Sequence, residues 1–149
     1  MDIVVDRTLD IGLCLSILAE PEIWETISED TATIDNNIPD VINDMWLAIY
    51  ADKKVIGVCH LHQKYLNTVQ AHIQILKRHR EFSISAGECI IKWIKTNTEY
   101  KNIYTEVPSL YSNVIAFLKN YNFKEVGEIK DCYTKEQKTY NTYIYQKVL

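Results

Sequence analysis

The sequence predicts an α/β fold: a mixed, mostly antiparallel seven-stranded sheet with helices on both faces. In its middle, three apolar segments follow one another across short polar turns, which is typical of an antiparallel meander. Its second half adds strand-length segments and two segments whose apolar residues recur every three or four positions, as in amphipathic helices. A mixed sheet covered by helices is the natural architecture for this order. The expected strands are residues 3–5, 45–50, 55–63, 69–76, 102–107, 124–132 and 139–147.

The first forty residues predict two short helices and a loop. Residues 9–18 form a helix that stops near Pro21, and residues 21–28 form a second one. Residues 29–43 are polar, acidic and without periodicity. In a compact domain such a long loop is often functional, so it is a candidate lid on the substrate side.

Two longer helices are expected at residues 85–96 and 110–121. Ser85 and Glu88 fit a capping box, which marks the start of the first one. The residues expected to face inward are Ala86, Cys89, Ile90, Trp93 and Ile94 in the first helix, and Val114, Phe117, Leu118 and Tyr121 in the second.

Composition limits the class of protein. The chain has 149 residues, of which 47% are hydrophobic and 24% charged, so residues 1–149 are expected to be a single domain with one core. Its formal net charge of −4 gives no general attraction to nucleic acid or an anionic membrane, and we expect neither as a partner. No apolar run approaches the roughly 18 residues that a membrane span needs.

The cysteines indicate the compartment. Cys14, Cys59, Cys89 and Cys132 are scattered, without a Cys-x-x-Cys pair. The acidic first residues are too few for a secretory signal. We therefore expect a cytoplasmic protein whose cysteines are reduced, small buried hydrophobes rather than catalytic or metal-binding residues.

The segment 73–88 is the most informative part of the chain. An apolar strand runs into the basic cluster 77–80, a turn with Ser83 and Ser85, and the start of an amphipathic helix. Backbone N–H groups at a helix N-terminus, the helix dipole and nearby arginines all favour a phosphate. The sequence therefore predicts a local anion site in which Arg80 is the principal side chain and the two serines either contact the ligand or cap the helix.

Histidines are expected to share one face of the meander. With a turn centred near residue 66, His60 falls opposite His72 and His62 opposite Gln70, and Gln74 extends the same polar face. This face is a candidate for an open substrate cleft, with His72 as a general base. The alternative is that these are half-exposed sheet residues or core histidines. A zinc site of His60, His62 and His72 lacks a Cys or carboxylate at ligand spacing, and no metal site is predicted.

The motif Arg80-x-x-Ser83-x-Ser85 between a strand and a helix resembles the acyl-CoA loop of the GNAT superfamily of N-acetyltransferases, which has the form Arg/Gln-x-x-Gly-x-Gly/Ala. The order of elements resembles this superfamily along nearly the whole chain. Residues 21–24 and 72–76 are most similar to small GNAT-like proteins encoded by tailed phages. Serine replaces both loop glycines, and a Cβ there can block the approach of a phosphate or a positive φ.

A second part of the resemblance lies between Pro108 and Gly127. This helix and strand are similar to the family's Gly-Phe ending, here with Phe123, although Asn122 stands where Gly is usual. The resemblance also places Asn113 at the cofactor.

The resemblance implies an acetyl-CoA-dependent N-acetyltransferase that transfers the acetyl group directly to an amine of a small molecule or a protein. The loop amides with Arg80, Ser83 and Ser85 would hold the pyrophosphate, and the backbone of Ile75 and Lys77 would hold the pantetheine. Direct transfer needs a base, oxyanion donors and an acid for the leaving thiolate.

The expected acid departs from the family pattern. The family's tyrosine aligns with Leu118, which has no proton to donate, so Tyr121 or Tyr111 takes this role or both merely pack. Glu22 and Trp24 are further candidates for the acceptor cleft, Trp24 being expected in the core. The competing interpretation is an inactive GNAT-fold phage protein that acts as a binding or virion-assembly factor. A homodimer is compatible with either.

Overall fold

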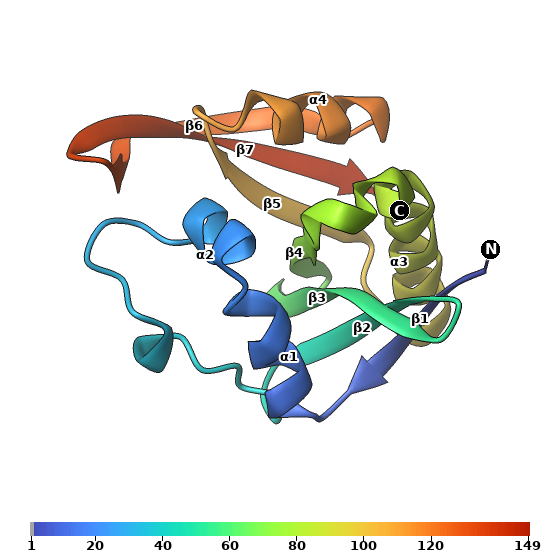
Figure 1. Ribbon diagram of the computed structural model, residues 1–149. Coiled ribbons are helices and arrows are strands. Elements are labelled where there is room, and N and C mark those ends of the chain that lie inside the picture. The colour runs from blue at the N-terminus through green and yellow to red at the C-terminus, as the bar shows by residue number, and fades with distance from the viewer. Residues whose placement is uncertain (1) are drawn as a thin grey trace.

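The structure is a computed structural model that describes residues 2–149. At its centre is a seven-stranded sheet with the order β1-β2-β3-β4-β5-β7-β6 (Figure 1). β4 and β5 are parallel, and the other neighbouring strands are antiparallel. The strands are β1 (Ile3–Thr8), β2 (Met45–Ala51), β3 (Lys54–Tyr65), β4 (Thr68–Ile75), β5 (Asn102–Pro108), β6 (Lys124–Lys135) and β7 (Lys138–Val148). The helices are α1 (Ile11–Leu18), α2 (Pro21–Ile27), α3 (Ser83–Asn97) and α4 (Ser112–Asn120), with short 3-10 helices η1 (Ile34–Asn36) and η2 (Lys77–Phe82).

Different helices cover the two faces of the sheet. α3 buries Ile90 and Ile94 in one cluster with Leu47, whereas α1 and α2 share a cluster with Trp46 and Val58. Successive strand residues point to opposite faces, so Trp46 and Leu47 place the two clusters on opposite sides of the sheet. Burial of a side chain such as Leu47 contributes about 1.5–3 kcal/mol. The predicted α/β class, with helices on both faces, is confirmed.

α4 lies beside α3. A Cβ at Gly87 of α3 would stand 3.3 Å from the ring of Phe117 and 3.4 Å from that of Tyr121. Leu118 completes the buried face of α4 and packs in one cluster with Val107 and Tyr145 of the sheet. This close contact sets the distance between the two helices that flank the functional cavity described below.

The expected capping box at residue 85 is wrong. α3 begins two residues earlier, at Ser83, and no side chain caps it. The reason is that η2 leads directly into α3, so the Ser83 N–H already donates to the carbonyl of Arg80. Ser85 is therefore an exposed residue of the first helical turn.

Three further side chains lie elsewhere than expected. Val114 is 40% exposed, because α4 buries only a narrow stripe against the sheet. Cys132 is exposed on the edge strand β6, unlike the other three cysteines. Trp24 is half-buried and lines a cavity rather than the core.

The end of α4 explains why Asn122 is acceptable where Gly is usual. Asn122 has a φ of 60°, in the left-handed region. Its N–H donates to the Lys119 carbonyl at 3.0 Å, and the Phe123 N–H donates to the Leu118 carbonyl at 3.0 Å, which is a Schellman motif. Asparagine is, after glycine, the residue that best tolerates this conformation.

β4 and β5 pair over only three residues each. Thr68–Gln70 pair with Asn102–Tyr104, and the strands then diverge. At the point of divergence, the Thr105 hydroxyl donates to the Ala71 carbonyl at 3.0 Å. Within residues 2–149, no helix combines the length and apolar character of a membrane span.

Candidate functional site

A cavity of about 1110 Å³ lies where β4 and β5 separate. Six of the eight site residues predicted from the sequence line it: His72, Ile75, Arg80, Ser83, Asn113 and Tyr121. The other two do not. Ser85 is exposed on α3, and the backbone N–H of Lys77 is bound by another part of the chain. The structure therefore brings together most of the residues expected for a cofactor, from four different elements.

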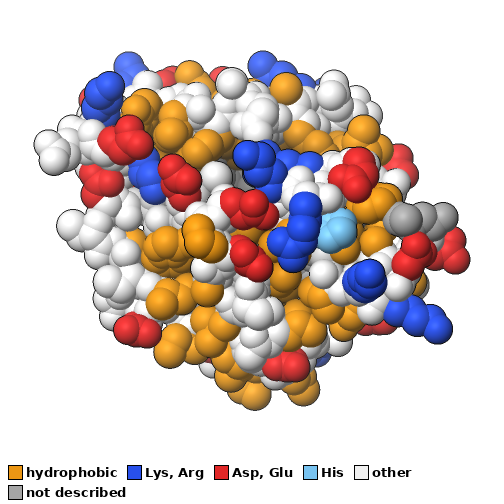
Figure 2. All heavy atoms as spheres, viewed as in Figure 1, with side chains coloured by type: hydrophobic (Ala, Val, Ile, Leu, Met, Phe, Trp, Pro, Cys, Tyr) orange, Lys and Arg blue, Asp and Glu red, His pale blue; other side chains and the backbone are white. Residues whose placement is uncertain are grey.

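Arg80 and Ser83 form the basic end of the cavity. Arg80 comes from η2, and Ser83 is the first residue of α3, with a φ of −57° and a ψ of −39°. Because this conformation is helical, serine occupies it without strain, and a glycine is not required for a positive φ. Figure 2 shows basic and acidic side chains adjoining on this face of the molecule.

Glu22 accepts a hydrogen bond from a backbone N–H group beside this basic end. Its Oε1 accepts a hydrogen bond of 2.7 Å from the N–H of Lys77, the first residue of η2. The contact joins α2 to the segment after β4. It shows that this N–H is directed at an anionic oxygen in the present structure.

The expected histidine face is confirmed. His60 pairs with His72 and His62 with Gln70, and the rings of His60 and His72 lie 6.1 Å apart between centroids. Burial, together with the nearby His60, lowers the pKa of His72 to about 4, and the charge of Glu106 only partly opposes this. His72 is consequently a neutral imidazole at pH 7 and a weak base. Its role as the base stays a prediction.

Asp44 was missed in the sequence because it precedes β2 and lies 16 residues from the nearest histidine. Its carboxylate accepts from His60 Nε2 at 2.6 Å and from His62 Nδ1 at 2.7 Å. Burial opposes ionisation of Asp44, but the bonds from His62 and His60 outweigh it and lower its pKa. The strand register gives the signal that was available, since Met45 pairs with Leu61, which places residue 44 next to residue 62.

Glu106 is a second residue that sequence reasoning missed. It lies on β5, faces the cavity close to His72, and accepts a 2.6 Å hydrogen bond from the Tyr104 hydroxyl. The alternation along β5 was the available signal, because Ile103, Thr105 and Val107 are buried and the residues between them are not. Glu106 and His72 thus form a polar wall at the opening between the two strands.

No protein-family model and no curated protein sequence matches the chain. Solved structures do match along nearly their full lengths. Spermidine N-acetyltransferase from Vibrio cholerae, in complex with CoA and spermine, has a TM-score of 0.81 at 13% identity and covers 98% of this chain and 95% of its own. A GNAT-family acetyltransferase from Streptococcus pneumoniae has a TM-score of 0.74 at 14% identity, and the match covers 99% of this chain and 100% of that one. Ribosomal-protein-alanine N-acetyltransferase from Brucella melitensis has a TM-score of 0.76 at 14% identity, and the match covers 98% of this chain and 99% of that one.

The fold is the GNAT fold. At these identities the likeness concerns the backbone, and the chemistry has to be argued from this chain's own side chains. The predicted seven-stranded GNAT architecture is thereby confirmed.

Two groups of tyrosines border the cavity of this GNAT fold. The Tyr121 hydroxyl donates to the Ile84 carbonyl, and burial, followed by the charge of Glu88, raises its pKa. The hydroxyls of Tyr111 and Tyr133 are hydrogen-bonded to each other at 3.2 Å, and the Tyr133 hydroxyl also donates to the Ser28 carbonyl. Tyr121 reaches the basic end, whereas the other two close the opposite end beside α2.

The loop 29–43 forms one wall of the cavity and is tied to the β6–β7 hairpin. Both carboxylate oxygens of Asp30 accept hydrogen bonds from backbone N–H groups, of Glu136 at 2.9 Å and Gln137 at 2.8 Å. These N–H bonds lower the pKa of Asp30. Lys135 adds a bond to the Ser28 carbonyl at 2.8 Å. The predicted loop lies on the cavity as expected, and its role as a lid stays a prediction.

Proposed function

We propose that the protein is an acyl-CoA-dependent N-acyltransferase that transfers an acetyl group to an amine. The observation that carries this proposal is the opening between β4 and β5, which has Arg80 and Ser83 at one end and Glu106 beside His72 at the other. This arrangement places an anion-binding group and a proton-accepting group on the two sides of one cavity. The GNAT fold of the structural neighbours supports the same proposal.

The residues present fit a pyrophosphate-bearing cofactor. Arg80 and Ser83 supply a charged donor and a hydroxyl, and the N–H of Lys77 already holds an anionic oxygen, that of Glu22. Beyond Gln70, β4 has no partner in β5, so Ile75 lies in the stretch that can pair with an extended pantetheine chain. Asn113 would contact the cofactor from α4. Acetyl-CoA, when bound, supplies the activated acyl group.

The acceptor end of the cavity is acidic. Glu29, Asp40, Asp44 and Glu106 line it, and Arg80 lies at the other end. Carboxylates favour the ammonium form of an amine on entry, and one of them, directly or through water, accepts its proton before attack. We assign this proton to Glu106, because its carboxylate lines the cavity close to His72 and its charge attracts an ammonium group, and we assign the protonation of the leaving thiolate to Tyr121. The acceptor is then a cationic amine, on a small molecule or a protein.

Direct binding tests the proposal. Acetyl-CoA at about 100 times its dissociation constant stabilises a native protein by about 2.7 kcal/mol, so it should clearly raise the melting temperature. Arg80→Ala should abolish the shift and leave the melting temperature of the free protein unchanged, since Arg80 is exposed. Arg78→Ala, at a neighbouring exposed arginine that does not line the cavity, is the matched control. A melting temperature that does not change in millimolar acetyl-CoA would contradict the proposal.

Glu22 should compete with the cofactor for the Lys77 N–H. Glu22→Gln weakens the existing bond, because a charge-assisted hydrogen bond is roughly twice as strong as a neutral one, and removes a negative charge beside the pyrophosphate. We expect acetyl-CoA to bind up to about fivefold more tightly in this variant. Isothermal titration calorimetry measures the change, with Glu25→Gln on the exposed side of α2 as the control. Weaker binding in Glu22→Gln would show that Glu22 positions the loop instead of competing.

A second candidate function is supported by the same contact and by Leu118. With Glu22 on the Lys77 N–H, Tyr121 bonded to Ile84, and a leucine where the family has its acid, the chain has features of a GNAT fold without catalysis. In that case it serves as a binding or assembly factor, as a phage virion protein would, alone or as a homodimer. The four unpaired cysteines support a reducing, cytoplasmic setting for either function.

A further inference from the structure

We propose that Asp44, His60 and His62 form a binding site for a divalent transition-metal ion, with Zn²⁺ as the best match. One carboxylate oxygen of Asp44 lies 2.6 Å from His60 Nε2 and the other 2.7 Å from His62 Nδ1. The three residues can each offer one ligand atom within 4.8 Å of the others. The proposal depends on these side chains alone and stands whether or not the cavity transfers acyl groups.

The fold brings the three ligands together through strand register. His60 and His62 are two residues apart on β3, so their side chains leave the same face of the sheet. Asp44 directly precedes Met45, which pairs with Leu61 between the two histidines. Two antiparallel strands therefore supply a His-x-His pair and a carboxylate opposite it, a set that sequence spacing alone does not reveal.

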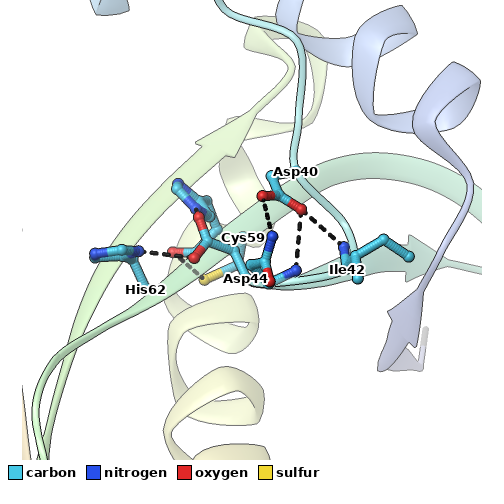
Figure 3. Close-up of polar contacts among 7 residues, drawn as sticks. Asp40, Ile42, Asp44, Cys59 and His62 are labelled. Carbon is cyan, nitrogen blue, oxygen red and sulfur yellow. Dashed lines mark hydrogen bonds and ion pairs between the residues drawn. The ribbon is translucent and has the colours of Figure 1, made fainter.

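The ligands are held in place before any ion binds. The His60 ring stacks on Trp46 with centroids 4.4 Å apart and planes inclined by 8°. Asp40 accepts from the N–H groups of Ile42 at 3.1 Å and Asn43 at 2.9 Å, which fixes the turn that delivers Asp44. Figure 3 shows this turn, with Asp44 and His62 facing each other. Supported ligands of this kind lose little freedom when they bind a metal.

The donor set and spacing suit zinc. Two imidazole nitrogens and one carboxylate oxygen are preferred ligands of Zn²⁺, whereas Mg²⁺ and Ca²⁺ favour oxygen alone. Bonds of about 2.0–2.1 Å put tetrahedral ligand atoms roughly 3.3 Å apart, so the present contacts need to widen by roughly 0.6 Å. Small side-chain rotations achieve this, because the side chain of His62 is 52% exposed and that of His60 25%.

The position of the site leaves it open. Asp44 and His60 line the cavity and the exposed His62 borders solvent, which gives an ion a path of entry. Three protein ligands leave a fourth tetrahedral position for water or for a donor atom of a molecule in the cavity. The metal would also link the end of the loop 29–43 to β3. The competing explanation is a hydrogen-bonded triad that makes this link without a metal.

Metal titration separates the two explanations. Chelator-treated protein comprising residues 1–149 is titrated with Zn²⁺ by calorimetry and with Co²⁺ by absorption spectroscopy. We expect one saturable equivalent, intense visible Co²⁺ bands of a four-coordinate N/O site without a thiolate charge-transfer band, and a Zn²⁺-dependent rise in melting temperature. Asp44→Asn, His60→Gln and His62→Gln should each weaken binding by at least about tenfold.

His79→Gln and Cys132→Ser are the controls, because they remove a histidine and an exposed thiol outside the cluster. Both should bind as the parent does. The proposal is overturned if no saturable binding occurs, if binding persists unchanged in all three ligand variants, or if a control loses binding as the ligand variants do. Should Asp44→Asn unfold, the exposed His62→Gln decides alone, since its folding is checked by circular dichroism without metal.

Discussion

Glu106→Gln is expected to lower acyl-transfer turnover by about 10²–10⁴-fold, the usual contribution of a general base. The substitution keeps the size of the side chain and its acceptor for the Tyr104 hydroxyl, so the cavity should keep its shape. Affinity for acetyl-CoA should change little, because Arg80 and Ser83 lie at the other end. Steady-state kinetics with a polyamine and a peptide amine as acceptors measure the loss.

The variant His72→Gln tests whether His72, and not Glu106, is the general base. Because the pKa of His72 is lowered to about 4, its imidazole is already neutral across the range in which amine acceptors are used. We therefore expect less than about a tenfold loss and an unchanged pH profile. A loss as large as that of Glu106→Gln, with a changed acidic limb, would transfer the role of base to His72.

Gly57→Ala is expected to destabilise the fold by about 2–3 kcal/mol, at the upper end for overpacking. An added Cβ would overlap the carbonyl oxygen of Gln74 and stand 3.1 Å from the Cα of Ile75. Both obstacles are backbone atoms, so β3 and β4 have to move apart where β4 meets the cavity. Chemical denaturation measures the free energy of unfolding.

The matched control is Gly127→Ala on β6. Its Cβ would meet only the side chain of Ile144, at an ordinary contact distance of 3.4 Å. We expect a change within about 0.5 kcal/mol, because alanine also restricts the unfolded chain. Equal effects at the two positions would show that the β3–β4 contact is not the source of the loss.

Periodicity was sufficient for the fold because the strands and helices bury regular apolar faces. The strand register of β3 and β4 followed from one turn, and the pairing of His60 with His72 was correct. The boundary of α3 was not predictable, since it depends on η2, whose backbone takes the place of a side-chain cap.

Long-range contacts account for what the sequence did not predict at the site. Arg80, Ser83 and His72 belong to one continuous segment and were predicted, whereas Asp44 reaches the cavity from the turn before β2 and Glu106 from β5. Likewise, the bond between Glu22 and Lys77 spans 55 residues. Such partners have no fixed spacing in the sequence, so the strand order and register have to be known before they can be identified.

The three-residue pairing of β4 with β5 divides the sheet mechanically. Strands β1 to β4 form one half of the sheet, and β5, β7 and β6 form the other, because each half is internally joined by long antiparallel ladders. The parallel ladder between them, followed by the hydrogen bond from Thr105 to Ala71, joins the two halves through the fewest paired residues in the sheet. A change of twist at this ladder would alter the width of the cavity, because Ala71 and Thr105 belong to the cavity lining.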